Sequence, residues 1–230
     1  MTTTEGEQDS RAEVVACDLE GTLTTAETWR AIATRLKATD RERRYRNFVL
    51  RRLPKVLAVR LSLVDRQRFR DAWITDFAGL LRGFTESDME ELAERIVAEE
   101  LWPARRPAVV SELEGHRAEG RAVVLCSGTY QPVLDAIARR LDAQALGTPL
   151  ESRDGRLTGR LVEAPSTGAR KAARLRVALG GRLLQSAYGD TLADAEMMEA
   201  SREPVAVQPE AGLRRLASSR GWRILEAEAG

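Results

Sequence analysis

The sequence predicts an α/β protein: a parallel sheet flanked by helices, with an all-helical cap inserted near its start. Two observations predict the sheet. Short apolar runs bounded by turn residues alternate with segments whose apolar residues recur at helical spacing. Polar residues follow where several of those runs end, as they do at the ligand-binding edge of a parallel sheet. A third observation predicts the insert, because residues 26–103 have a helical pattern throughout.

The strands are expected where β-branched or small apolar residues form short runs. These runs are "EVVACDL" (13–19), "RAVVLCSG" (121–128), "LLQSAYGD" (183–190) and "EPVAVQ" (203–208). The helical segments "QPVLDAIARRLDA", "GARKAARLRVAL" and "TLADAEMMEASR" lie between them. Strands alternating with helices in this way predict a Rossmann-like parallel sheet with helices on both faces.

The predicted organisation has a tail, a core and a cap. Residues 1–12 are polar and are expected to be a disordered tail. Residues 13–25 and 104–230 form the predicted Rossmann-like core, and 26–103 form the helical cap. Within the cap, Thr85 and Asp88 have the spacing of a capping box. A small hairpin is expected over 151–162, turning at Asp154 and Gly155.

Composition excludes several function classes. The chain has 230 residues, 43% of them hydrophobic and 31% charged, which is typical of a soluble globular protein. Its net charge of +1 does not favour nucleic-acid binding. No apolar stretch is long enough for a stable membrane insertion, and the start has no secretory signal, so a cytoplasmic location is expected. The oligomeric state does not follow from the sequence.

Histidine and cysteine are too few for two common chemistries. One histidine and two cysteines cannot build a four-ligand zinc site, and a serine-hydrolase triad would require His116. We expect His116 to lie solvated on a surface helix. Cys17 and Cys126 are expected to pack in buried strands, and the four tryptophans to pack in the core or cap.

Three strand ends carry residues suited to phosphoryl chemistry. Asp18 and Glu20 end the first, Ser127 and Gly128 the second, and Asp190 the third, with Asp194 one helical turn further on. The ends of parallel strands meet at one edge, so these groups can converge, and Lys171 can reach the same edge. Clustered carboxylates need a cation, and oxygen ligands suit Mg²⁺, which commonly engages phosphate. The pattern predicts a metal-assisted phosphoryl site.

The paired carboxylates at the first strand end allow two roles. If strand geometry persisted, Asp18 and Glu20 would share a face. One carboxylate could then attack phosphorus while the other donates a proton to the leaving oxygen and later accepts one from water.

Four motifs together resemble the haloacid dehalogenase-like (HAD) phosphatases. They are "DLEGTLT", "LCSGT", Lys171 in "GARKAARL", and "YGDTLAD". The helical insert corresponds to that family's cap, and "DGRLTGRL" resembles its phosphoserine-phosphatase-like subgroup. The resemblance implies an Mg²⁺-dependent phosphatase that acts on a small phosphorylated substrate through a phosphoaspartyl intermediate.

The resemblance also implies roles for individual residues. Asp18 would be the nucleophile, with Glu20 as general acid and base. Mg²⁺ would be held by Asp18, the backbone carbonyl of Glu20, Asp190 and, through water, Asp194. Ser127, Gly128 and Lys171 would bind the phosphoryl group.

Two departures from the family pattern bear on the reaction and the substrate. Most members have aspartate at the position of Glu20, and some glutamate-bearing members pass the phosphoryl group to an alcohol. A phosphotransferase is therefore one alternative, and a non-catalytic binding protein with a basic cap is another. Phe77 stands where phosphoserine phosphatases carry an arginine for the substrate carboxylate, which leaves Arg70 or Arg82 for that role. Glu27 is either a ligand for the substrate's amino group or an acid at a helix N-terminus.

The cap contains a strongly basic segment. Residues 41–70 carry eleven basic side chains against Glu42 and Asp65, interleaved with apolar residues. This pattern is typical of a solvated helix face over the cap core. It also fits peripheral contact with an anionic membrane surface or a lipid-like phosphorylated substrate.

Overall fold

The core of the protein is a six-stranded parallel sheet. The computed structural model describes residues 13–37, 41–60 and 65–226, with the backbone alone described for 53–60. The strand order is β3-β2-β1-β6-β7-β8. The strands are β1 (Val14–Cys17), β2 (Ala122–Tyr130), β3 (Gln144–Thr148), β6 (Leu184–Gly189), β7 (Glu203–Val207) and β8 (Arg223–Leu225). The predicted fold class is confirmed, and the predicted tail, 1–12, lies outside the described residues.

Helices cover both faces of this sheet, which explains why β1 is apolar at every position. Val15 and Cys17 pack into a cluster with α6 (Pro107–Ala118) and α7 (Gln131–Arg140). Val14 and Ala16 face the opposite cluster, with α8 (Gly168–Leu179), α9 (Ala195–Glu199) and α10 (Ala211–Arg220). Alternate residues of a strand point to opposite faces, so a central strand covered on both sides needs no polar position.

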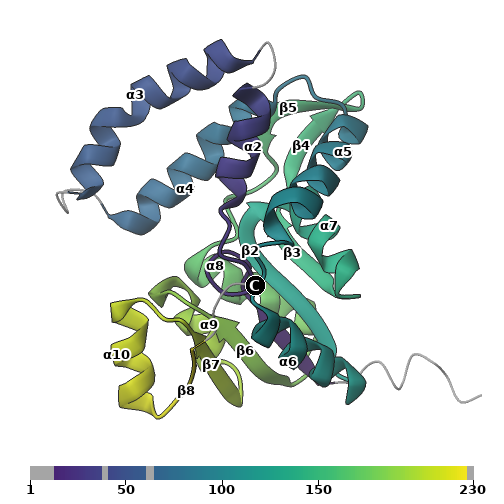
Figure 1. The fold of residues 1–230 in the computed structure, drawn as a ribbon, viewed down its shortest axis with the longest axis vertical. Coiled ribbons are helices and arrows are strands. Elements are labelled where there is room, and N and C mark those ends of the chain that lie inside the picture. The colour runs from purple at the N-terminus through teal and green to yellow at the C-terminus, as the bar shows by residue number, and fades with distance from the viewer. Residues whose placement is uncertain (1–12, 38–40, 61–64, 227–230) are drawn as a thin grey trace, which may run out of the picture.

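The segment between β1 and α6 is helical, as the sequence predicts. It contains α2 (Thr28–Lys37), α3 (Glu42–Arg60), α4 (Arg66–Phe77), η1 (Ala78–Leu81), α5 (Glu86–Ile96) and the π-helical turn η2 (Val97–Leu101). Figure 1 shows α2, α3 and α4 standing above the sheet, and we call these three the cap helices. In contrast, α5 packs against α7 of the core layer. Residue limits for a core and a cap therefore stay a prediction.

Local signals in the sequence have the expected structural consequences. Thr85 and Asp88 form the reciprocal bonds of a capping box at the start of α5. The hairpin is present as β4 (Leu150–Arg153) and β5 (Arg156–Leu161). Its two turn residues, Asp154 and Gly155, both have positive φ, as a two-residue hairpin turn requires.

An aromatic cluster holds the cap helices together. The Phe48 ring of α3 meets Trp73 of α4 edge-on, with centroids 5.0 Å apart, and Trp29 of α2 meets Trp73 at 5.3 Å. Phe77, 1% exposed, completes the cluster. Such contacts stabilise beyond the area they bury. The predicted packing of Trp29 and Trp73, and that of Cys17 and Cys126 on buried strands, is confirmed.

The expectation for His116 is wrong. This residue lies on α6, but its ring is half-buried and bridges two elements: Nε2 is 2.9 Å from the Tyr188 hydroxyl of β6, and Nδ1 is 2.9 Å from an Arg121 nitrogen. The Tyr188 hydroxyl in turn donates to Glu112, 2.8 Å away. Helical periodicity could not reveal this role, because it depends on a strand about 70 residues later in the chain.

No helix in the described part of the chain is long and apolar enough to cross a membrane.

The half-buried position of His116 predicts a pH dependence of stability. Burial and the Arg121 guanidinium lower the pKa of His116 below its usual value. The unfolded chain takes up a proton near pH ~6.5, whereas the folded state keeps the ring neutral. The free energy of unfolding should therefore fall as pH drops below about 6.5. In His116→Gln this part of the slope should vanish in urea titrations across that range. An unchanged slope would show that His116 titrates alike in both states.

Candidate active site

Three carboxylates converge at the carboxyl edge of the sheet. Asp18 follows β1, Asp190 follows β6, and Asp194 ends the short 3₁₀ turn η3 (Leu192–Asp194). One oxygen from each lies within 4.8 Å of the others. β1 and β6 are neighbours in parallel register, with Cys17 opposite Tyr188, so the residues that follow them lie side by side. The convergence predicted from sequence is confirmed for these three residues.

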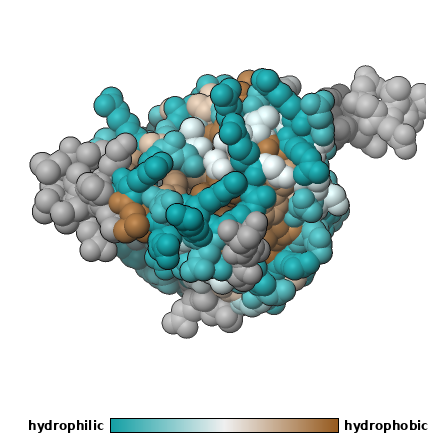
Figure 2. Space-filling view, turned by 90° about the horizontal axis from the view of Figure 1, so that it is seen from above, coloured by the Kyte–Doolittle hydropathy of each residue, from teal (hydrophilic) through white to brown (hydrophobic). Residues whose placement is uncertain are grey.

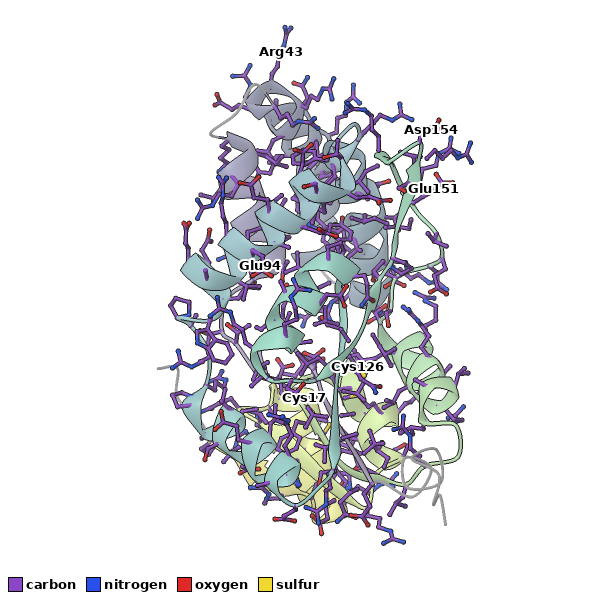
Figure 3. All side chains as sticks on the ribbon, turned by 90° about the vertical axis from the view of Figure 1, so that its right-hand side faces the viewer. Cys17, Arg43, Glu94, Cys126, Glu151 and Asp154 are labelled. Atoms are coloured by element: carbon purple, nitrogen blue, oxygen red, sulfur yellow. The ribbon has the colours of Figure 1, made fainter. Side chains whose placement is uncertain are left out.

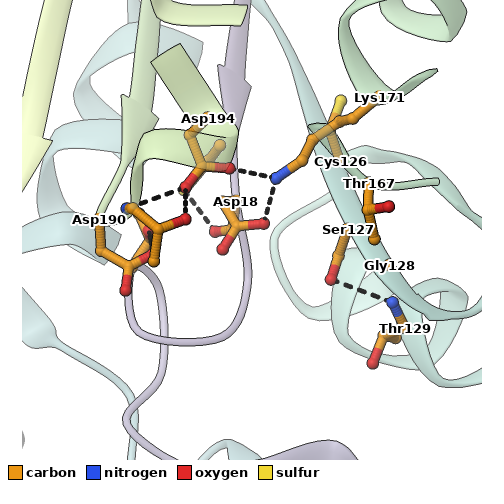
Figure 4. Close-up of polar contacts among 12 residues, drawn as sticks. Asp18, Cys126, Ser127, Gly128, Thr129, Thr167, Lys171, Asp190 and Asp194 are labelled. Atoms are coloured by element: carbon orange, nitrogen blue, oxygen red, sulfur yellow. Dashed lines mark hydrogen bonds and ion pairs between the residues drawn. The ribbon is translucent and has the colours of Figure 1, made fainter. Parts of the chain in front are cut away.

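Lys171 joins two of these carboxylates. It projects from α8, with Nζ 2.6 Å from Oδ1 of Asp18, and it also forms an ion pair with Asp194. Its side chain is almost fully buried, and Figure 4 shows it between Asp18 and Asp194 on one side and Ser127 on the other. Burial alone would lower the lysine pKa, but the two carboxylates raise it above its usual value. The ammonium is therefore charged at neutral pH.

The charge of the cluster fits a divalent cation. Burial and the neighbouring carboxylates raise the pKa of Asp18 to about 7, against the opposing effect of Lys171, and that of Asp190 to about 8. Burial also opposes the ionisation of Asp194. The Lys171 charge and the hydrogen bonds from the Thr191 N–H and hydroxyl outweigh the effect of burial, so the pKa of Asp194 is lowered. Three ionised carboxylates beside one ammonium leave two uncompensated negative charges. Carboxylate oxygens are the ligands that Mg²⁺ takes, so Asp18, Asp190 and Asp194 fit this ion.

The loop after β1 is shaped to let Asp190 approach. Gly21 has φ +88°, and a Cβ there would lie 2.1 Å from Oδ2 of Asp190. The Thr22 hydroxyl donates to Oδ1 of the same aspartate, 3.2 Å away. Thr22 is fully buried and orients Asp190, a role that sequence reasoning missed although Thr22 lies inside the first motif.

Glu20 points toward the cap. β1 ends at Cys17, so the strand geometry that would place Asp18 and Glu20 on one face does not persist. The Glu20 carboxylate accepts a hydrogen bond from the Thr28 N–H at the start of α2, 2.7 Å away. Burial raises the Glu20 pKa, with the Thr28 bonds and the nearby Arg70 opposing the shift. A metal role for the Glu20 carbonyl stays a prediction.

Ser127 and Gly128 occupy the far side of the site from Asp190 (Figure 4). Ser127 is buried, and its Oγ accepts from the Thr129 N–H at 3.2 Å. β2 extends two residues beyond its predicted end, through Tyr130, so both residues lie within the strand. A Cβ on Gly128 would lie 2.6 Å from Thr167 and 3.2 Å from Ile74 of α4. Glycine at this position permits the cap to approach the core.

The proposed substrate residues of the cap differ in availability. Glu27 precedes α2 and forms an ion pair with Arg30, three residues further on. Arg70 is exposed on α4 and close enough to Glu20 to lower its pKa. Arg82 donates instead to the Thr158 carbonyl of β5, 2.8 Å away. Among the described residues, Arg70 rather than Arg82 is thus the cation without a side-chain hydrogen bond near the site, and both substrate roles stay predictions.

A polar contact that the sequence did not reveal joins α4 to the start of α8. The Thr167 hydroxyl donates to Asp71 at 2.6 Å, and Gln67 donates to the Thr167 oxygen at 2.7 Å. Arg170 forms an ion pair with Asp71. We call these four residues the α4–α8 contact. Thr167 directly before a helix that starts with glycine is an N-cap signal, but nothing in sequence indicates its partners.

The α4–α8 contact joins a cap helix to the core beside a buried site. Asp18, Ser127 and Lys171 are all buried. A groove of about 730 Å³ lies between α4 and the segment 159–165, lined in part by Asp71 and Arg170, but none of the three buried residues lines it. The described structure therefore has its cap helices against the core. Asp18 is 7% exposed in this arrangement.

The fold and the site define an α/β protein whose carboxylate-and-lysine centre lies at the carboxyl edge of a parallel sheet, beneath cap helices. The chain belongs to the haloacid dehalogenase-like hydrolase family, whose model matches residues 15–199.

Similar proteins include phosphatases. Phosphoserine phosphatase SerB1 of Mycobacterium tuberculosis is 37% identical over 140 residues, which are 59% of this chain and 44% of SerB1. The chain thus spans less than half the length of that relative. Protein CicA of Caulobacter vibrioides is 33% identical over 204 residues, 86% of this chain and 87% of CicA. A Bordetella pertussis protein of unknown function superposes with a TM-score of 0.79 at 26% identity, covering 94% of this chain and 99% of its own.

The tight fit at Gly128 predicts a selective stability loss. In Gly128→Ala the added methyl group must displace Thr167 or Ile74, and overpacking of this kind costs about 1–3 kcal/mol. Gly115→Ala is the matched control, because it lies in α6 with no atom within 4 Å of the new Cβ. Alanine there should be neutral or stabilise by up to ~1 kcal/mol. Urea unfolding of both variants checks this; equal midpoints would contradict the close approach of α4.

Proposed function

We propose that this chain is an Mg²⁺-dependent phosphatase that hydrolyses a small phosphomonoester through a phosphoaspartyl intermediate on Asp18. One observation carries the proposal: Lys171 binds Asp18 and Asp194 at once, within a buried cluster that includes Asp190. Such a cluster orients a nucleophilic carboxylate and supplies positive charge where a phosphoryl group would be transferred. Membership of the hydrolase family and likeness to a phosphoserine phosphatase support the reaction class.

Asp18 is the proposed nucleophile. Lys171 holds its Oδ1, which leaves Oδ2 to attack phosphorus and displace the substrate alcohol. Water then hydrolyses the acyl phosphate and regenerates the carboxylate. Burial excludes bulk water from Asp18 while the cap is closed, which strengthens the interactions that orient it.

Lys171, Ser127 and Gly128 are the proposed phosphoryl-binding groups. The Lys171 ammonium, the Ser127 hydroxyl and the Gly128 N–H are donors suited to phosphate oxygens. Asp18, Asp190 and Asp194, with the Glu20 carbonyl, would hold Mg²⁺, which when bound supplies charge stabilisation for the transferring group.

Glu20 is the proposed general acid and base. A raised pKa keeps more of this carboxyl group protonated near neutral pH, as proton donation to a leaving alcohol requires. Its bond to the Thr28 N–H fixes one oxygen at the start of α2 and leaves the other for proton transfer. The acid is thus tied to the cap, so displacing α2 would also displace Glu20.

The proposed substrate is a phosphoserine-like metabolite or another phosphorylated alcohol. Glu27 would bind an amino group, and Arg70 a carboxylate or another anionic group. Phe77 cannot supply that cation, because its ring carries no charge, and it packs in the aromatic cluster. Phosphate release from a panel containing phosphoserine, histidinol phosphate and glycerol phosphates, with Mg²⁺ or with EDTA, identifies the substrate class.

A phosphotransferase is the second candidate, favoured by glutamate in place of the family's usual aspartate at position 20. It would use the same intermediate with an alcohol as acceptor instead of water. Adding an alcohol to the assay separates the two, because transfer would lower free phosphate and yield a new ester. A non-catalytic binding protein would release phosphate from no substrate.

The nucleophile role predicts the outcome of one substitution. Asp18→Asn should lower turnover to the background, because an amide does not attack phosphorus and no phosphoenzyme forms. Asp154→Asn, at the hairpin turn, makes the same atomic change outside the site and should leave turnover unchanged. Phosphate release and capture of the phosphoenzyme check this; turnover retained in Asp18→Asn would exclude Asp18 as the nucleophile.

The acid–base role predicts a graded effect at Glu20. Glu20→Gln keeps an acceptor for the Thr28 N–H but cannot donate a carboxyl proton, so kcat should fall by ~10²- to 10⁴-fold. The loss should shrink for substrates whose alcohol is a good leaving group, such as p-nitrophenyl phosphate. If kcat fell equally for substrates with good and with poor leaving groups, Glu20 would instead act by positioning α2.

A further inference from the structure

We propose that the outward face of α3 docks the protein on an anionic lipid surface. The face consists of Arg43, Arg44, Arg46 and Arg51, with Asn47 and Leu50 among them, and we call it the arginine face. This inference does not depend on the proposed phosphatase activity.

The burial pattern of α3 defines this face. The six residues of the arginine face are exposed, whereas Tyr45 and Phe48 are partly buried and pack against the core cluster. Helical spacing places Arg43, Arg46, Asn47 and Leu50 on one stripe, because residues three and four apart are neighbours. Figure 1 shows α3 as the cap helix farthest from the sheet. In Figure 3 Arg43 lies at the upper end of the molecule and its side chain extends outward.

The four arginines lack partners among the described side chains. None of them forms an ion pair or side-chain hydrogen bond with residues 13–37, 41–52 or 65–226. Arg52, which lies on the inward side, does form one, with Asp76 of α4. Arginines within a folded surface are usually balanced by nearby acids, and here Glu42 is the only acidic residue of α3.

Leu50 distinguishes a membrane from other anionic partners. It is 56% exposed and lies within the arginine face, and few large apolar side chains of the described chain are as exposed. Figure 2, which views the molecule from the cap side, shows extended hydrophilic side chains with apolar surface between them. Cations around an apolar side chain fit lipid headgroups over acyl chains, because arginines contact phosphates while the leucine enters the boundary region.

The distribution of charge over the chain would orient the molecule. The whole chain has a net charge of only +1, while residues 41–70 carry eleven basic residues against two acidic ones. The remainder is therefore net acidic. An anionic surface would attract the cap and repel the rest, so α3 would face the lipid and the sheet would stay away from it.

Vesicle binding of the full chain tests this proposal. Vesicles of phosphatidylcholine alone are compared with vesicles that also contain phosphatidylglycerol, at low and high salt. We expect binding to the anionic vesicles only, weakening as salt rises. Equal binding to both vesicles, or binding to neither, would overturn the proposal.

Two matched triple variants locate the contact. Arg43→Gln, Arg46→Gln and Arg51→Gln together remove three of the four positive charges of the arginine face. Arg176→Gln, Arg202→Gln and Arg215→Gln remove the same charge from exposed, unpaired arginines of the described core. The first set should lower the vesicle partition coefficient by on the order of 10²-fold, since each arginine near the surface contributes roughly tenfold or less. Equal losses from the two sets would show a non-specific charge effect and overturn the proposal.

A probe on the face reports insertion directly. Both natural cysteines are buried, so a thiol-reactive fluorophore attached through Asn47→Cys should label that position selectively. Its emission should shift to the blue on anionic vesicles, while the same probe at Ser218→Cys on α10 should not shift. A shift at Ser218 alone would overturn the assigned orientation. Duplex DNA added as competitor should not remove the protein from vesicles at equal phosphate; complete removal would favour a nucleic-acid site.

Discussion

The structure depends on the contact of one buried ammonium with two buried carboxylates. Lys171 from α8, Asp18 after β1 and Asp194 after β6 come from three separate elements, and their charges stabilise one another where water cannot. Removing Lys171 would leave Asp18 and Asp194 buried without a compensating charge, which is costly in a low-dielectric interior. The same contact places α8 over the sheet and orients Asp18. Stability and the proposed chemistry therefore have the same origin.

Lys171 alone does not balance the three carboxylates of the site. The loop after β1 nevertheless allows the third of them, Asp190, to approach. Gly21 and Thr22 bring Asp190 close to Asp18, although burial and the Asp18 charge raise the pKa of Asp190 to about 8. A proton or a cation would relieve the excess negative charge. The arrangement thus fits the divalent ion proposed above, because packing brings the three carboxylates together.

The cap is coupled to the site at two points of different character. Glu20 accepts a hydrogen bond from the start of α2, and Thr167 joins α4 to the helix that carries Lys171. Motion of the cap would therefore change the environment of Glu20, the proposed acid, and that of Lys171, the proposed phosphoryl-binding lysine. The arginine face lies on α3, the cap helix that makes neither contact. A surface bound to α3 would leave both couplings intact.

The sequence by itself determined the parallel α/β fold and the three acids and lysine of the core, because these follow from hydrophobic periodicity and from residues next to strand ends. It also predicted the hairpin turn and the capping box, which depend on neighbours within a few residues. Only the tertiary structure decided that His116 bonds Tyr188, that Glu20 points to α2, and that Asp71 meets Thr167. Each of these contacts joins groups that local patterns cannot relate. Their geometry depends on how the helices pack on the sheet and on where a strand ends. The spacing of residues along the chain predicts neither of these.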